Sequence, residues 1–95
     1  MAARGHKRVT VGTSDIDVVA ASYAAGGPRA GCCDAIRVHA AGSLYCLLEG
    51  MADDATPTQH QFYAAGDGLG LRIRTIKSTN DGSTAMDVDL YWDEP

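Results

Sequence analysis

Short runs of alternating apolar and polar residues recur along the chain, separated by turn residues. The runs cover residues 8–13, 33–40, 43–48, 58–63, 69–76 and 86–92, and residues 16–21 form a further short extended segment. A period of two is typical of half-buried strands, and strands at a spacing of about 8–12 residues are typical of antiparallel sandwiches and barrels. The pattern predicts an all-β fold without a helix. We expect a small antiparallel β-sandwich, jelly-roll-like, or a barrel, of roughly six to eight short strands.

Turn residues between the runs predict how the strands connect. Residues 24–31 (AAGGPRAG) and 50–57 (GMADDATP) contain glycine and proline, so we expect them to be loops. Ala41-Gly42 leaves only a tight turn between two of the runs, 33–40 and 43–48, and predicts that they form a hairpin. Residues 58–63 are polar, which indicates an edge strand or a strand with one solvated face.

The last two runs, 69–76 and 86–92, flank a polar segment with Asn80-Asp81-Gly82, which suits a chain reversal. If they pair as a hairpin, a register that places Ile73 opposite Val88 brings apolar residues together on one face. The same register places opposite charges across from each other on the other face: Arg74 with Asp87, and Arg72 with Asp89. A slip by one residue would disrupt both faces, because side chains alternate with a period of two. The sequence therefore predicts a hairpin whose register these four charges select.

Composition restricts the classes of partner. Twelve acidic and eight basic residues give a net charge of −4, which argues against a nucleic-acid-binding protein with a basic contact face. The one basic concentration is Arg4, His6, Lys7 and Arg8 at the N-terminus. We expect residues 1–8 to be an arm, either touching an acidic neighbour or solvated, and residues 9–95 to form a single domain. No run is long enough for a membrane-spanning helix of roughly 20 residues, and we expect no signal peptide.

The three cysteines are Cys32, Cys33 and Cys46. An odd number without a secretion signal indicates free thiols in a reducing cytoplasm. Cys33 and Cys46 fall in alternating runs, where a buried cysteine behaves as a small apolar residue. A metal site at Cys32-Cys33-Asp34 would lack the spacing of known zinc motifs. We therefore expect the cysteines to be structural.

Other residue types with chemical potential do not form a known catalytic or binding motif. Asp53-Asp54 and the pair Asp87 and Asp89 lack the ligand spacing of a calcium loop. Residues 66–70 (GDGLG) precede a strand instead of the helix that a phosphate-binding loop requires. The three histidines are not accompanied by a recognisable nucleophile motif, and G-x-S-x-G is absent. We expect no enzyme activity, no metal and no cofactor.

Two pairs of adjacent aromatic residues, Phe62-Tyr63 and Tyr91-Trp92, lie in predicted strands. Neighbours in a strand point to opposite faces. One member of each pair should therefore lie in the core and the other on the outer face. An outer Tyr91 is either an interface anchor or a half-exposed side chain.

Three stretches carry a resemblance to a known family. Residues 11–15 (VGTSD) are similar to its opening V-x-P-S-D, and residues 35–42 (AIRVHAAG) to its stretch R-A-hydrophobic-V-G-x-A-G. Residues 65–92 are similar to A-G-x-x-L-P-L-R-V-x-x-V-x-x-T-G-T-T-A-x-x-I-V-A-L-Y. The clearest points of that stretch are Leu71-Arg72-Ile73, Ser83-Thr84-Ala85 and Leu90-Tyr91. On these residues the chain resembles, over positions 9–92, the head-spike base proteins of alphaproteobacterial gene transfer agents and related tailed phages.

The resemblance implies a structural virion protein on the capsid exterior, assembled in the cytoplasm of a bacterial host, and not an enzyme. It would be a spike or fibre base or a head decoration protein. The implied partners are further copies of the chain in a pentamer or trimer, the major capsid protein and a spike or fibre protein, without nucleic acid or membrane. The residues expected to contact the capsid or a neighbouring subunit are Arg4, Lys7, Arg8, Arg29, Asp53, Asp54 and Tyr91.

Other functions remain open from the residues alone. The chain can be a tail or neck component of the same kind of particle. It can also be a carbohydrate-binding β-sandwich, in which Tyr63 or Tyr91 would supply an aromatic platform beside polar groups. A small hydrolase is a further alternative, which would need a nucleophile and a base to converge in a cleft.

Overall fold

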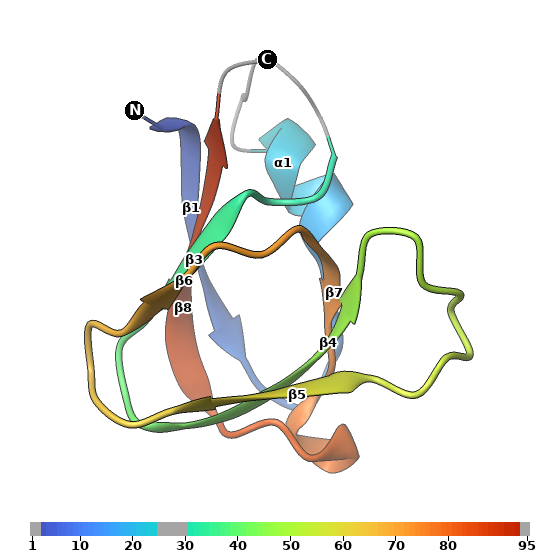
Figure 1. The fold of residues 1–95 in the computed structure, drawn as a ribbon, viewed down its shortest axis with the longest axis vertical. Coiled ribbons are helices and arrows are strands. Elements are labelled where there is room, and N and C mark those ends of the chain that lie inside the picture. The colour runs from blue at the N-terminus through green and yellow to red at the C-terminus, as the bar shows by residue number, and fades with distance from the viewer. Residues whose placement is uncertain (1–2, 25–30, 94–95) are drawn as a thin grey trace.

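The computed structural model describes residues 3–24 and 31–93, which form two four-stranded antiparallel sheets packed against each other (Figure 1). The two sheets share no strand, so the fold is a β-sandwich and not a closed barrel. The expected all-β sandwich is confirmed, with eight strands in the described residues.

The first sheet has the order β1-β8-β3-β6. Its strands are β1 (Ala3–Val11), β8 (Met86–Asp93), β3 (Ala35–Val38) and β6 (Gly68–Leu69). The second sheet has the order β2-β7-β4-β5. Its strands are β2 (Ile16–Asp17), β7 (Ile73–Ile76), β4 (Gly42–Leu48) and β5 (Thr58–Phe62). Strand β5 is an edge strand, as its polar sequence predicted.

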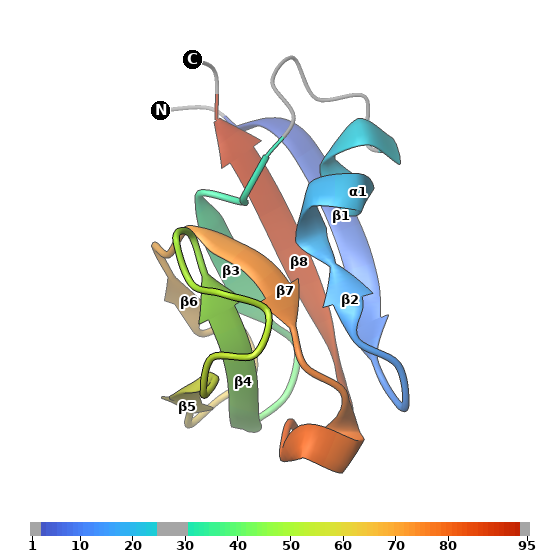
Figure 2. The ribbon, with the colours of Figure 1, turned by 90° about the vertical axis from the view of Figure 1, so that its right-hand side faces the viewer.

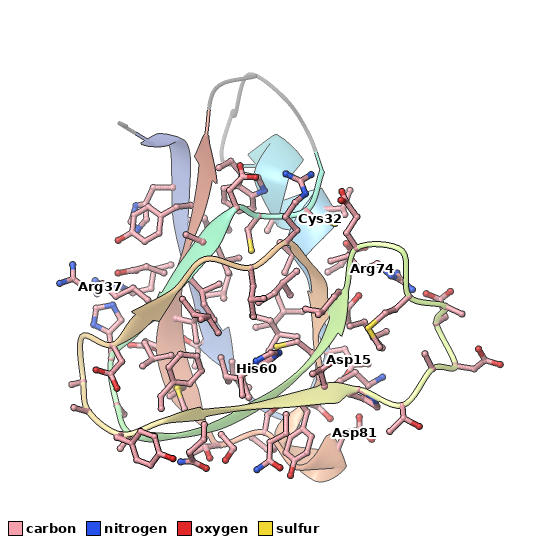
Figure 3. All side chains as sticks on the ribbon, viewed as in Figure 1. Asp15, Cys32, Arg37, His60, Arg74 and Asp81 are labelled. Carbon is pink, nitrogen blue, oxygen red and sulfur yellow. The ribbon has the colours of Figure 1, made fainter. Side chains whose placement is uncertain are left out.

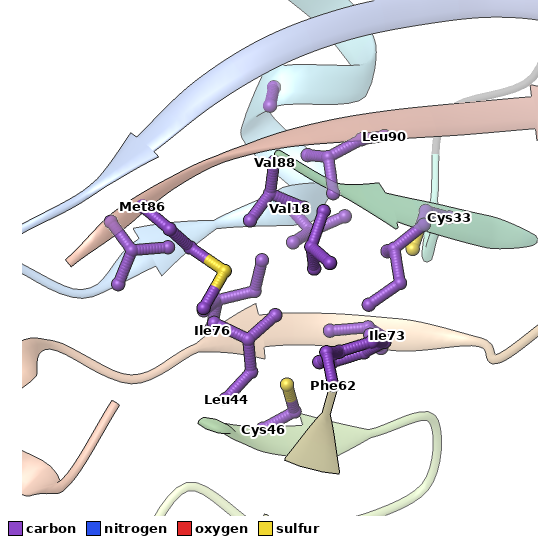
Figure 4. Packing of buried hydrophobic residues seen from close by; sticks show 14 of the residues in the cluster. Val18, Cys33, Leu44, Cys46, Phe62, Ile73, Ile76, Met86, Val88 and Leu90 are labelled. Atoms are coloured by element: carbon purple, nitrogen blue, oxygen red, sulfur yellow. The ribbon is translucent and has the colours of Figure 1, made fainter. Parts of the chain in front are cut away.

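The apolar residues of the alternating runs fill the space between the sheets (Figure 4). Met86, Val88 and Leu90 of β8 are buried, and they belong to the same cluster as Ile73 of β7. Trp92 is buried as well, and its indole Nε1 donates a hydrogen bond of 3.0 Å to the carbonyl of Gly31. The predicted inward faces of these two runs are therefore confirmed at these positions.

The cysteines are free, and two of them belong to this core. Burial raises the pKa of Cys33 to about 11 and that of Cys46 to about 12. Burial also raises the pKa of Cys32, which is only partly buried. The prediction that Cys33 and Cys46 act as small apolar core residues is confirmed.

The predicted hairpin between residues 69–76 and 86–92 is wrong. Its second run is β8, which lies between β1 and β3, whereas β7 lies between β2 and β4 in the other sheet. The chain crosses from one sheet to the other through a short 3-10 helix, η1 (Thr79–Asp81). The physical reason is that the apolar faces of the two runs pack face to face across the interior, where both are covered, instead of lying side by side in one sheet.

The predicted hairpin between residues 33–40 and 43–48 is also wrong, because β3 and β4 belong to different sheets. The chain changes sheets just before Gly42, whose φ is +150° and where an added Cβ would lie 2.7 Å from the Cβ of Thr84. This close approach leaves room only for glycine. The local hairpin that does form joins β4 to β5 through residues 49–57.

Residues 18–24, part of which was expected to be extended, form the helix α1 (Val18–Ala24). The carboxylate of Asp17 accepts the backbone N–H of Ala20 at 3.1 Å, which caps the first turn. Val18 and Ala21 are three positions apart and face the core, where α1 packs against β1, β2 and β7 (Figure 2). Most of the expected loop that follows, residues 25–30 with Arg29, lies outside the described residues.

The predicted N-terminal arm is wrong over residues 3–8, which belong to β1. They pair with β8 in a register that places His6 opposite Tyr91 and Arg8 opposite Asp89. The reason is complementarity with β8, because His6 stacks on Tyr91 and Arg8 donates to the carboxylate of Asp89.

Candidate functional site

Three side chains from two other segments converge on the carboxylate of Asp89, on the outer face of β8. Arg8 Nε lies 3.0 Å from Oδ1, His6 Nε2 lies 3.2 Å from Oδ1, and His39 Nε2 lies 2.7 Å from Oδ2. His6 and Arg8 come from β1, and His39 follows the end of β3. We call these four residues the Asp89 cluster. It joins the three longest strands of the first sheet on their outer side.

The pKa of Asp89 is determined by the three hydrogen-bond donors that surround its carboxylate. Burial by itself would raise the pKa of Asp89, but hydrogen bonds from Arg8, His39 and His6 outweigh it and hold that pKa well below its usual range. The carboxylate side chain is only 6% exposed. An ionised carboxylate only accepts hydrogen bonds, so each histidine donates its Nε2–H to it. The cluster is therefore a satisfied ionic centre at neutral pH.

Polar and aromatic contacts extend this face on both sides of the cluster. The ring of His6 stacks on Tyr91 with a centroid distance of 5.0 Å and an interplanar angle of 29°. The hydroxyl of Thr10 donates to Asp87 Oδ1 at 2.7 Å. Figure 3 shows Arg37 projecting outward from the same sheet, and its Nε donates to the carbonyl of Gly66 at 3.3 Å. The face presents charge, hydroxyl and aromatic groups together.

The described contacts within the cluster are hydrogen bonds and ion pairs to one carboxylate. Both histidines donate to Asp89 through Nε2, which fixes the orientation of their rings. Among the described residues no group of three or more His, Cys, Asp or Glu side chains is placed to hold a metal ion, and no pocket forms.

Arg72 and Arg74 bond to groups beside the second sheet and do not form the predicted pairs with Asp89 and Asp87. The fork of Arg72 binds the carboxylate of Glu49 through Nε at 3.0 Å and one terminal nitrogen at 2.8 Å. Its other terminal nitrogen lies 2.5 Å from Asp34 Oδ1. Arg74 donates through Nε to the carbonyl of Met51 at 2.9 Å.

Arg74 also forms an ion pair with Asp53. Together the two arginines hold residues 49–53 against the start of β7 and the segment before it. The predicted pairs of Arg72 with Asp89 and of Arg74 with Asp87 are therefore wrong, because these residues lie in opposite sheets and each charge finds a nearer partner.

The predicted contact residues fall in different parts of the molecule. The structure places Arg8 in the Asp89 cluster, Tyr91 against His6, Lys7 in β1 and half-buried, Asp53 on Arg74, and Asp54 on the exposed loop. Arg4 lies in β1, and Arg29 lies outside the described residues. No finding tests whether these residues contact a partner, so that role stays a prediction.

Sequence reasoning missed His6 and His39 as partners of Asp89. An available signal for His39 was its position on the polar side of the run 33–40, whereas His6 lies outside the alternating runs. It could not indicate that the two polar sides meet at one carboxylate, because His39 is 50 residues from Asp89 along the chain.

A second surface lies at the side of the sandwich formed by the edge strands β5 and β6, opposite β1 and β2 (Figure 2). Tyr63, which follows β5, is 82% exposed, and Leu69 of β6 is 39% exposed. They are the large hydrophobic side chains that the described residues expose. The carboxylate of Asp67 accepts the backbone N–H groups of Tyr63 and Ala64 at 3.0 and 3.1 Å, which fixes the turn between the strands.

Comparison with protein-family models, with curated proteins and with solved structures found no match to the chain. The described residues include no helix with the length and hydrophobicity needed to cross a lipid bilayer.

Proposed function

We propose that the chain is a structural protein of a tailed phage or phage-like particle, attached to the capsid exterior as a spike or fibre base or as a head decoration protein. The observation that carries this proposal joins the sequence resemblance to the fold. The resembling stretches, residues 35–42 and 65–92, are far apart in the chain, and together they supply β3, β6 and β8 of the first sheet and β7 of the second. The resemblance thus extends over strands of both sheets of a small β-domain.

The architecture suits a part that other proteins bind. Ion pairs tie strands and loops together on the outside of both sheets, at Asp89 in one and at Arg72 and Arg74 in the other. These ties hold the outer surfaces in fixed positions, which lowers the entropic cost of docking. The proposed partners are further copies of the chain, the major capsid protein and a spike or fibre protein, with Asp54 and Tyr91 among the proposed contacts.

Immunogold labelling of intact particles from the source culture, with antibody to this protein, tests the proposal. Label at isolated vertices supports a spike or fibre base, and label over the whole shell supports a decoration protein. Label at the tail would replace capsid attachment by a tail or neck role. Particles that are detected by antibody to the major capsid protein but carry no label for this chain would refute the proposal.

The stacked pair of His6 and Tyr91 favours carbohydrate binding as a second candidate function. An aromatic ring on the same outer face as Asp87 and Arg8 offers both a stacking surface and hydrogen-bonding groups, which sugar ligands require. A glycan screen followed by chemical-shift mapping tests this function. Ligand-induced shifts around Tyr91 in the natural chain, with glycan binding that is lost in Tyr91→Ala and kept in Tyr63→Ala, would support it, and the absence of any binding glycan would contradict it.

A further inference from the structure

The sandwich has four edge strands, β1 and β6 in the first sheet and β2 and β5 in the second. Proteins protect sheet edges with charge, bulges, short strands or covering segments, because an unprotected edge pairs with other chains. Strand β1 carries three basic residues and a register shift between Ala3 and Gly5. Strands β2 and β6 have two residues each. Three of the four edges are therefore protected.

Strand β5 has none of these protections. It has five residues, TQHQF, and none of them carries a formal charge at neutral pH. Its pairing with β4 is continuous from Gly42 opposite Phe62 to Cys46 opposite Thr58, without a register shift. Tyr63 follows directly and is 82% exposed. This edge is regular, uncharged and bordered by an exposed aromatic ring.

The backbone of β5 offers its hydrogen-bonding groups at two positions. Its neighbours on β4, Ser43 and Tyr45, direct their backbone groups away from β5. Ser43 exchanges bonds with Thr84, and Tyr45 accepts from Lys77 N–H at 2.8 Å. The residues opposite them, Gln61 and Gln59, therefore sit at positions that do not bond to β4. In an antiparallel ladder such residues point their N–H and C=O groups to the other side, which here is the free edge.

We propose that β5 pairs antiparallel with β5 of a second copy of this chain, about a two-fold axis at His60, and joins the two second sheets into one continuous sheet. In this register Gln59 faces Gln61 of the second copy, and Gln61 faces its Gln59. These are the positions whose backbone groups point outward, so both pairs form backbone hydrogen bonds. His60 meets its counterpart at the non-hydrogen-bonded position between them.

The composition of β5 favours a second copy of this chain as the partner that pairs with its free edge. A two-fold pairing requires a segment that is complementary to itself, and a strand with charges of one sign would place like charges in contact. The amides of Gln59 and Gln61 are neutral and already bond to Ser43 within the chain, at 3.3 and 2.6 Å, so facing glutamines bring no unpaired charge into the contact. The inference does not depend on the proposed function. It gives a dimer contact, and a pentamer or trimer would need a different one.

Charge variants of the full-length chain test the pairing. Multi-angle light scattering over a dilution series should show a monomer–dimer equilibrium for the natural chain. The double variant Gln59→Lys/Gln61→Lys puts lysine opposite lysine twice and should weaken the dimer roughly tenfold or more. Gln59→Lys/Gln61→Glu puts lysine opposite glutamate twice and should restore it. The matched control Thr13→Lys/Asn80→Lys adds the same charge at exposed positions outside β5 and should leave the equilibrium unchanged.

Each outcome decides the proposal, with folding of every variant checked by circular dichroism. A natural chain that stays monomeric up to millimolar concentration overturns it. A dimer that survives the double lysine variant, or that the lysine–glutamate variant fails to restore, overturns the β5 register. Particle label together with a monomeric chain would leave the proposed function standing and remove only this contact.

Discussion

Replacing Asp89 by asparagine tests the role of the Asp89 cluster directly. The substitution keeps the size of the side chain and removes its charge. Asparagine retains one acceptor oxygen, while its amide nitrogen is a donor and would face a donor nitrogen from Arg8 or His39. The carboxylate is surrounded by three donors, so at least one of them loses its acceptor in Asp89→Asn.

The expected loss in the free energy of unfolding depends on how far Asp89 and its three partners are buried. Hydrogen bonds to a charged group contribute about 1.5–3 kcal/mol when shielded, whereas exposed ion pairs contribute about 0.2–1 kcal/mol. The Asp89 side chain is 6% exposed, but those of Arg8, His6 and His39 are 57%, 50% and 37% exposed, so solvent screens the attraction. We expect Asp89→Asn to lower the free energy of unfolding by about 1–2 kcal/mol at pH 7.

Urea unfolding followed by circular dichroism measures this cost. With a slope of about 1 kcal/mol per molar urea for a small domain, the midpoint should fall by roughly 1–2 M. The pKa of Asp89 is lowered in the folded state. Its contribution is therefore present above the unfolded value of about 4 and is lost as the pH falls toward the folded value. The difference between natural chain and variant should be full at pH 7 and shrink below about pH 4.

Asp87→Asn is the matched control, since Asp87 lies on the same strand and face but is exposed and accepts from Thr10. It should shift the midpoint much less than Asp89→Asn. Equal shifts for the two variants, or a difference for Asp89→Asn that is the same at pH 7 and pH 3, would refute the assigned role of the cluster.

Three further predictions concern separate features of the fold. Burial lowers the pKa of His60 below 6.5, and its Nε2 has no hydrogen-bond partner among the described residues. Protonation of His60 therefore opposes folding, and the stability of the natural chain falls as the pH drops below the pKa of the unfolded state. His60→Phe should raise the urea midpoint more at pH 5 than at pH 8, and equal gains would contradict this. Gly82→Ala puts a Cβ at φ +111° and 2.9 Å from the ring of Tyr45, so it should cost at least about 1–2 kcal/mol, whereas Gly12→Ala, with open space around it, should be nearly neutral in thermal unfolding. The two core thiols, whose pKa values burial raises to about 11 and about 12, should react with a thiol reagent at pH 8 only as the chain unfolds, and rapid reaction of more than Cys32 in the folded protein would show that the core is open.

Alternation in the sequence determined which face of β8 is buried. Val88 and Leu90 were predicted to point inward and Asp89 outward from the period of two alone, and the structure places them so. The period is a local property, because the geometry of an extended backbone alternates side chains whatever the strand pairs with. The class of fold and the polar edge strand β5 follow from the same pattern.

The neighbours of each strand were decided only in the tertiary structure. Two alternating runs bury their apolar sides equally well side by side in one sheet or face to face across a sandwich, so the pattern cannot distinguish a hairpin from a crossing. The runs that contain Ile73 and Val88 lie in different sheets and pack face to face across the sandwich. Likewise, residues 18–21 became a helix because Asp17 caps them and the core accepts Val18 and Ala21.

The Asp89 cluster shows the same division between sequence and tertiary structure. The sequence determined that Asp89, Arg8 and His39 lie on polar sides of their strands. Only the pairing of β1 and β3 with β8 brought them together, since Arg8 and His39 are 81 and 50 residues from Asp89 along the chain. Charge partners at such separations are set by strand order, which depends on the cooperative packing of the whole core and not on any local pattern.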